Sequence, residues 1–107
     1  MIIRIIKDLR VDVYRDIEFM NNNSNHADII EIKKINNEFI ALFGQFCYTL
    51  SCNDINEVVY MLNHINNALD IIPLIDSDGV KLGLFYRGND DKYSFVRQIY
   101  LNKKVGE

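Results

Sequence analysis

The sequence of 107 residues lacks the short motifs that carry known chemistry. It has no glycine-rich phosphate-binding loop, no G-x-S-x-G nucleophile elbow and no H-E-x-x-H zinc motif. Histidine is nearly absent: His26 lies in an asparagine-rich stretch and His64 on the polar side of an apolar stripe. A general acid–base pair needs two such groups close together with a third to orient them. We therefore expect a protein that is not an enzyme and that uses no cofactor.

The chain also has little cysteine and no long apolar run. At the N-terminus the apolar residues are interrupted by Arg4, Lys7 and Asp8, which leaves them too short for a signal-peptide core or a membrane span. Without an export signal, we expect Cys47 and Cys52 to be free, buried thiols in a reducing cytoplasm.

The residues that bind metal ions do not occur in a useful arrangement. A structural zinc site needs four ligands, whereas here Cys47 and Cys52 have only His64 downstream of them. The stretch 76–79, Asp-Ser-Asp-Gly, is too short for a calcium-binding EF-hand loop and runs at once into a strand pattern. We interpret it as a hairpin turn and expect no metal site.

The feature around which the sequence is organised is the stretch 28–50. Two apolar runs flank Asn36 and Asn37, and asparagine tolerates the positive φ angles of a tight hairpin turn. The second run, 38–43, is apolar at both sets of alternate positions, which predicts a central strand buried on both faces and covered by helix on at least one. Gly44 predicts a bulge or bend, after which the strand continues to Leu50.

Two segments have the periodicity of helices. The clearer one spans 54–69, with Ser51 or Asn53 as its N-cap and acidic residues in its first turn. Its apolar stripe consists of Ile55, Val58, Val59, Leu62, Ile65 and Leu69. The other segment, 7–21, fits both a helical stripe and a strand alternation. Its length favours a helix, preceded by a short strand at 2–6, but the strand alternative stays open.

The remaining patterns predict strands at 71–75, 80–87 and 93–101, with turns at 76–79 and 88–91 and a polar tail at 102–107. The order is roughly α-β-β-α-β-β-β. It predicts a single α+β domain over residues 1–107, in which two helices pack on one face of a mostly antiparallel sheet.

Charge is unevenly distributed along the chain. The net formal charge is −3, yet residues 51–91 alone carry a net charge of −5 and residues 92–107 carry +3. Acidic balance argues against binding to nucleic acid or to anionic lipid. Aspartate is common in turns, so a solvated surface is one interpretation. The other is an acidic patch that docks a basic partner. Its residues are Asp54, Glu57, Asp70, Asp76, Asp78, Asp90 and Asp91.

Composition adds a resemblance to this picture. The chain has 16 isoleucines and 13 asparagines, as an AT-rich mobile or accessory bacterial gene would encode. A small, acidic α+β domain without catalytic residues resembles the immunity proteins of contact-dependent growth inhibition systems. The resemblance concerns the character of the whole chain and carries over no individual residue. It implies a tight complex with a cognate toxin, often a basic nuclease domain, whose active site or a nearby surface is masked.

The C-terminal strands suggest an alternative function. They contain Phe85, Tyr86, Tyr93, Phe95 and Tyr100 together with Arg87, Lys92 and Arg97. Aromatic side chains on an open sheet can stack bases, although the glycine-containing pattern of RNA-recognition strands is absent. The alternative is thus a small phage or mobile-element regulator that binds a protein or RNA through these strands. The sequence leaves the oligomeric state open.

Overall fold

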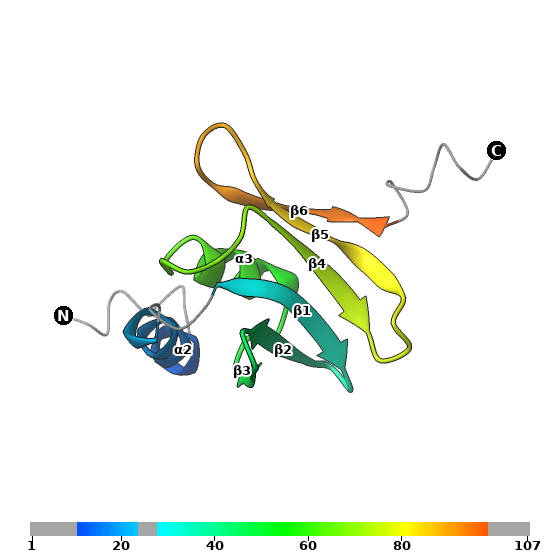
Figure 1. Ribbon diagram of the computed structural model, residues 1–107, viewed down its shortest axis with the longest axis horizontal. Coiled ribbons are helices and arrows are strands. Elements are labelled where there is room, and N and C mark those ends of the chain that lie inside the picture. The colour runs from blue at the N-terminus through cyan, green and yellow to red at the C-terminus, as the bar shows by residue number, and fades with distance from the viewer. Residues whose placement is uncertain (1–10, 24–27, 99–107) are drawn as a thin grey trace.

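The computed structural model describes residues 11–23 and 28–98 (Figure 1). These residues form two helices and one six-stranded sheet, an α+β fold that is mostly antiparallel, as the sequence predicts. In chain order the elements are α2 (Val11–Asn22), β1 (Ile29–Ile35), β2 (Glu38–Phe43), β3 (Phe46–Leu50), α3 (Ile55–Leu62), β4 (Ile71–Asp76), β5 (Lys81–Arg87) and β6 (Tyr93–Arg97). The predicted strand at 2–6, the loop around His26, the end of the last strand and the polar tail lie outside the described residues.

The element order contains one strand more than the sequence predicts. Gly44 has a φ of 62° and begins a two-residue turn that reverses the chain, so that Phe43 pairs with Phe46. The segment after Gly44 is therefore a separate antiparallel strand, β3, and not a bulged continuation of β2. The hairpin turn predicted at Asn36 and Asn37 is confirmed, since both residues have positive φ, at 52° and 68°.

The strand order across the sheet is β3-β2-β1-β4-β5-β6, and β1 and β4 are the one parallel pair among the described strands. As predicted, Glu38–Phe43 is an interior strand, because β2 pairs with β1 on one side and with the edge strand β3 on the other. The prediction that both of its faces are buried is wrong, since Ile40 and Leu42 on the second face are only half-buried. After β3 the chain passes through α3 and returns beside β1, which places β1 and β4 in the middle. A parallel pair needs such a crossover, and α3 supplies it.

One face of the sheet carries the core. The buried strand residues on it are Ile29, Ile32, Phe39, Ala41, Phe43, Leu50, Ile72, Leu74, Phe85 and Tyr93. They pack with residues of both helices, including Val13 and Met20 of α2 and Val58 and Met61 of α3. Gly83 also lies on this face, and a Cβ atom there would overlap the Phe95 ring and the Val96 carbonyl oxygen. The absence of a side chain at Gly83 therefore lets Phe95 pack over β5.

Segment 11–22 is helical, so the structure decides between the two patterns found in the sequence. Its buried residues are Val13, Asp16, Ile17 and Met20. The Asp16 carboxylate accepts hydrogen bonds from the Tyr48 hydroxyl at 3.0 Å and from the Ser51 backbone N–H at 2.6 Å. Phe19 stacks on Tyr48 with ring centroids 4.4 Å apart. The helix is thus fastened to β3 by polar contacts as well as by apolar packing.

Helix α3 is shorter than its apolar stripe predicts. It begins after Asp54, not after Ser51 or Asn53, and ends at Leu62. Beyond it the backbone finds partners elsewhere: Asn21 accepts from Asn66 N–H and donates to the His64 carbonyl oxygen, and Ile29 N–H donates to the Asn67 carbonyl oxygen. Because α2 and β1 satisfy this backbone, residues 63–70 form a loop.

Candidate functional site

The second face of the sheet has no described helix on it, and we call it the open face. In Figure 1, β1 passes in front of α3, so the viewer looks toward this side. By register it carries Glu31, Lys33 and Ile35 of β1, Ile40 and Leu42 of β2, Cys47 and Thr49 of β3, Ile71, Pro73 and Ile75 of β4, Leu84 and Tyr86 of β5, and Ser94 and Val96 of β6.

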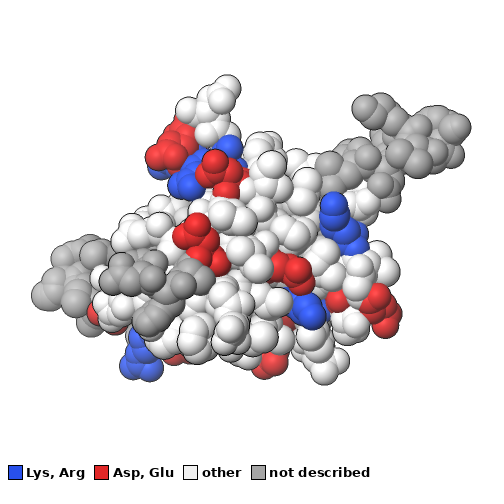
Figure 2. Space-filling view, in the orientation of Figure 1, with Lys and Arg blue, Asp and Glu red and all other residues white. Residues whose placement is uncertain are grey.

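Most of these side chains are apolar, and several are well exposed. Ile71 is 60% exposed and Tyr86, its register partner on β5, is 38% exposed. Figure 2 shows a surface that is mostly uncharged on this side, with a few isolated charged side chains. The open face also accounts for the unbroken apolar run from Phe39 to Phe43 in β2: Ile40 and Leu42 are half-buried on this face without a helix above them. Apart from Glu31 and Lys33 on β1 the face is mostly apolar, and a large exposed apolar surface is typical of a protein-binding site.

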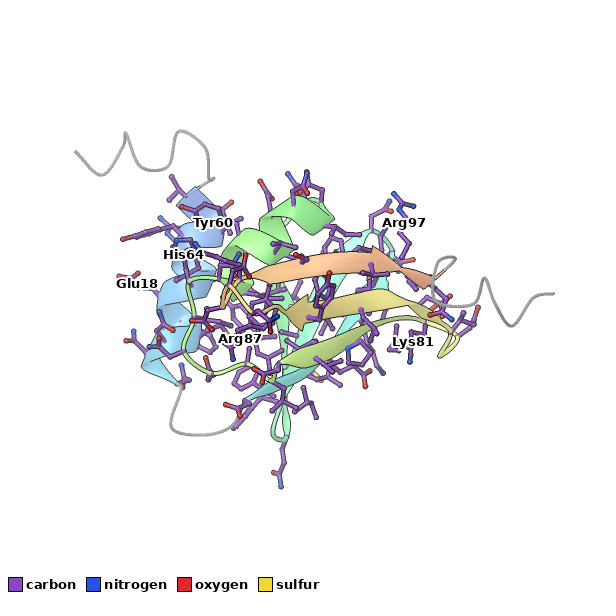
Figure 3. All side chains as sticks on the ribbon, turned by 90° about the horizontal axis from the view of Figure 1, so that it is seen from above. Glu18, Tyr60, His64, Lys81, Arg87 and Arg97 are labelled. Carbon is purple, nitrogen blue, oxygen red and sulfur yellow. The ribbon has the colours of Figure 1, made fainter. Side chains whose placement is uncertain are left out.

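The seven acidic residues of the predicted patch fall into separate groups. Asp76 and Asp78 lie in the turn between β4 and β5, whereas Asp90 and Asp91 lie in the turn between β5 and β6. These turns are at opposite ends of β5, which Lys81 and Arg87 mark in Figure 3. The fold therefore brings together no single patch of seven, but sets acidic turns at both ends of the open face.

Most of these acids also hold local structure. Asp54 is the N-cap of α3 and accepts from Glu57 N–H at 2.9 Å, while Glu57 accepts from Asn53 N–H at 2.7 Å. The arrangement resembles a capping box, except that Glu57 accepts from the residue before the N-cap and not from the N-cap itself. The Asp76 carboxylate accepts from the backbone N–H groups of Asp78 and Val80, at 2.8 and 2.9 Å. The turn role of aspartate therefore accounts for part of the acidic pattern.

Asp70 and Asp91 both interact with the guanidinium group of Arg87. Arg87 donates to Asp70 Oδ1 from Nε at 2.9 Å and from Nη2 at 2.8 Å, and its Nε lies 3.8 Å from Asp91 Oδ1. The guanidinium lies 5.1 Å from the centroid of the Tyr93 ring. The hydrogen bond to Asp70 raises the pKa of Arg87, so the cation is permanent. This cluster ties the loop before β4 to the β5–β6 hairpin and offsets acidic charge at that end.

A groove lies on the helix side of the sheet, between the start of α3 and the edge of β6. Its volume is about 680 Å³, and a second hollow of about 390 Å³ shares part of its wall. Apolar side chains and two cations line the two together: Phe39, Ile55, Val59, Leu74, Leu82 and Phe95 with Lys34 and Arg97. Sequence reasoning missed this groove, because the residues of its two hollows come from six elements with no shared motif.

The aromatic residues of the C-terminal strands face mostly inward. Phe85 is fully buried and Tyr93 is 4% exposed, and Phe85 packs on Phe95 with ring centroids 4.8 Å apart. Stacking of nucleic-acid bases needs accessible ring faces. Phe85 and Tyr93 therefore offer no platform for it, while Tyr86 lies on the open face and Arg97 is exposed. Tyr100 is outside the described residues.

The groups that could support chemistry are dispersed. Cys52 is buried and Cys47 is exposed on the open face, so the prediction that Cys47 is buried is wrong: β3 is an edge strand whose second face no helix covers. His64 stacks on Tyr60 with ring centroids 4.3 Å apart, and its Nδ1 lies 2.8 Å from the Tyr60 carbonyl oxygen. Within residues 11–23 and 28–98, no three His, Cys, Asp or Glu side chains are grouped as metal ligands.

No protein family model matches the chain, and no curated protein or solved structure matches it. The helices that the structure describes include none long and apolar enough to cross a membrane. The open face and the groove are therefore the two features of the molecule from which a function can be inferred.

Proposed function

We propose that this protein is an immunity protein, which binds a cognate toxin domain in a stoichiometric complex and neutralises it in the cytoplasm. The observation that carries the proposal is the open face, an apolar sheet surface with acidic turns at both ends. An inhibitor of this kind needs no catalytic group. It needs only a surface that fits its partner and excludes substrate from it.

The dimensions of the open face suit a protein partner. Six strands spaced about 4.8 Å apart make a surface roughly 25 Å wide. Stable interfaces combine an apolar centre with a polar rim, and their affinity depends on a few large side chains near the centre. Ile71 and Tyr86 are large, exposed side chains of the open face, paired near one end of β4 and β5. We assign them the role of anchors.

The acidic turns favour a basic partner. Asp78 in one turn and Asp91 in the other are exposed, and the chain carries a net charge of −3. Acidic groups at the rim of an interface speed the capture of a basic protein and contribute less to its final affinity. We therefore propose a basic toxin domain, and a nuclease suits this description because it must itself bind an anionic substrate.

The proposal predicts that a toxin domain is encoded beside this protein's gene, and the test uses that domain. Co-expression of the two proteins is expected to restore growth, and the purified proteins are expected to form a one-to-one complex in which the toxin is inactive. Ile71→Lys places a cation on the open face, at the start of β4. It is expected to weaken the complex at least about tenfold and to abolish protection.

The matched control is Val11→Lys, which introduces the same cation at an exposed apolar residue of α2. It is expected to leave protection unchanged. The double variant Asp78→Asn/Asp91→Asn is expected to slow association at low salt and to have little effect at high salt. A toxin that stays fully active when saturated with this protein would contradict the proposal. Equal effects of Ile71→Lys and Val11→Lys would contradict the choice of surface.

A further inference from the structure

The outer edge of β6 has backbone groups available for pairing. Among the described strands only β5 pairs with β6. In an antiparallel pair, alternate residues exchange hydrogen bonds with the neighbouring strand, and the others direct their N–H and C=O groups to the opposite edge. The Tyr93 N–H donates to Asn63 Oδ1, on the far side from β5, at 2.8 Å. Phe95 and Arg97 have the same parity as Tyr93, so their backbone groups also point outward.

Asn63 closes only one end of this edge. It is the C-cap of α3, and α3 runs from there along the helix side of β6. Past Tyr93 the space between the two elements widens into the groove described above. The outward backbone of Phe95 and Arg97 therefore borders a groove that is large enough to receive side chains.

The charges in the groove favour an acidic occupant. Lys34 and Arg97 line both of its hollows. Within residues 11–23 and 28–98 neither is ion-paired, and Lys34 lies 5.8 Å from the centroid of the Phe39 ring. The one acid in the wall is Asp54, whose Oδ1 already caps α3. Gln98 lines the smaller hollow, and its buried Oε1 has no hydrogen-bond partner in the described part of the chain.

We propose that the β6 edge binds an extended segment of a partner protein, which adds to the sheet as a seventh strand. Backbone hydrogen bonds to Phe95 and Arg97 would hold the segment in register, as in other cases of strand addition. Alternate side chains of an added strand point to the same face. On the helix side, we expect the added strand to carry an apolar residue that contacts Ile55, Val59 and Phe95. Two positions away, an acidic residue would pair with Lys34 and Arg97.

This inference does not depend on the proposed function. The groove is on the helix side of the sheet, whereas the proposed toxin-binding surface is the open face. Ile71 is absent from the walls of both hollows, and Lys34 points to the helix side. Either site can therefore fail its test while the other passes.

The probe is a fluorescent heptapeptide, Thr-Val-Thr-Glu-Thr-Val-Thr, whose Val and Glu residues share one face of a strand. Its binding to the full chain is measured by fluorescence anisotropy, and the amide signals of Phe95 and Arg97 are followed by NMR. We expect saturable binding that shifts these two amide signals. Replacing the Glu of the peptide by Lys is expected to weaken binding at least about tenfold, because the cation would face Lys34 and Arg97.

Backbone pairing is tested by N-methylation of the peptide at its odd-numbered or at its even-numbered residues. In a strand these two sets of N–H groups point to opposite edges, so one set is expected to abolish binding and the other to leave it nearly unchanged. Equal effects of both sets would overturn strand addition, as would binding without shifts at Phe95 and Arg97.

Matched protein variants test the role of the two cations. Lys34→Gln/Arg97→Gln is expected to weaken binding of the peptide at least about fivefold. The control Lys33→Gln/Lys81→Gln removes the same charge from positions that do not line either hollow, and it is expected to bind normally. Equal binding by the two double variants, both shown to be folded by circular dichroism, would overturn the assignment of Lys34 and Arg97.

Discussion

At the scale of single residues, Asp16 is the least expected feature of the molecule. It belongs to a helix with an otherwise apolar inner face, yet it is only 2% exposed. Desolvation by burial raises the pKa of its carboxyl group above the ordinary value of 3.8, although the hydrogen bonds from Ser51 and Tyr48 oppose this change. Burial and the Asp16 charge together raise the pKa of Tyr48 to about 12. The hydrogen bond between Asp16 and Tyr48 therefore holds α2 on β3, and its contribution to the free energy of unfolding depends on pH.

We predict that Asp16 makes the free energy of unfolding fall as the pH rises from 3.8 through the higher pKa of the folded state. In this window the folded protein binds more protons than the unfolded chain, so deprotonation favours unfolding. Asp16→Asn removes the titration and can keep both contacts, with the Tyr48 hydroxyl as acceptor from the amide. The stability of Asp16→Asn relative to the natural protein should therefore rise with pH between about pH 3 and pH 7.

Urea denaturation of both proteins over this range measures the difference. Taking the difference cancels the titration of carboxylates that the two proteins share. The control is Tyr48→Phe, which removes one donor to the carboxylate and should extend the window of falling stability to higher pH. A difference between Asp16→Asn and the natural protein that is independent of pH would refute this account.

At the scale of elements, α3 shows how a short helix is delimited. It has eight residues, too few to be stable alone, so packing and capping must hold it. At its N-terminus, Asp54 accepts from Glu57 N–H and Glu57 accepts from Asn53 N–H. On its inner face, Val58, Met61 and Leu62 are buried in the core. Its C-cap, Asn63, uses its side chain to bind the Tyr93 N–H. The helix is thus held by its N-terminal hydrogen bonds and by the core, and through Asn63 it contacts β6.

Asp54→Ala is expected to lower the free energy of unfolding by about 1 kcal/mol, because the Glu57 N–H loses its acceptor and the helix dipole loses a favourable charge. Asn56→Ala is the matched control, since Asn56 is exposed in the same turn. It should change stability by less than about 0.5 kcal/mol, or raise it slightly through the higher helix propensity of alanine. Chemical denaturation distinguishes the two, and equal effects would show that Asp54 has no capping role.

At the scale of the whole molecule, the sheet has two unlike faces. The two described helices cover one face. The other face carries apolar residues from all six strands and has no described helix over it. A sheet covered on one side normally has polar residues on its other side. The departure from this rule is the strongest sign of a partner in the structure, and the groove at the β6 edge is a second, separate one.

Neighbouring residues of β4 allow this asymmetry to be measured. Ile72 is fully buried under the helices, whereas Ile71 is 60% exposed on the open face. Ile72→Ala should lower the free energy of unfolding by about 2–5 kcal/mol, because it leaves a cavity in the core. Ile71→Ala should change it by less than about 0.5 kcal/mol. Thermal or urea unfolding of the isolated protein provides the measurement, and a large loss for Ile71→Ala would mean that the open face is covered.

The local patterns were sufficient where the structure depends on nearby residues. The asparagine pair at 36–37 predicts its own turn, because few other residues tolerate two successive positive φ angles. The short apolar run of β2 predicts a strand, and the apolar stripe starting at Ile55 predicts α3. The same reasoning found aspartates in turns and at a cap, but it could not separate that local role from binding.

Long-range contacts decided the rest. Periodicity shows which side chains share a face but contains no information on what covers that face, so Cys47 and Ile71 proved to be exposed. The sequence by itself determined most of the strands and turns and the α+β class, but not the reversal at Gly44 that makes β3 a separate strand. Only the tertiary structure decided that α3 stops at Leu62, that β4 pairs with β1, and that one apolar face stays open. Each of these depends on contacts between residues far apart in the chain, such as Asn21 with Asn66 and Ile32 with Leu74.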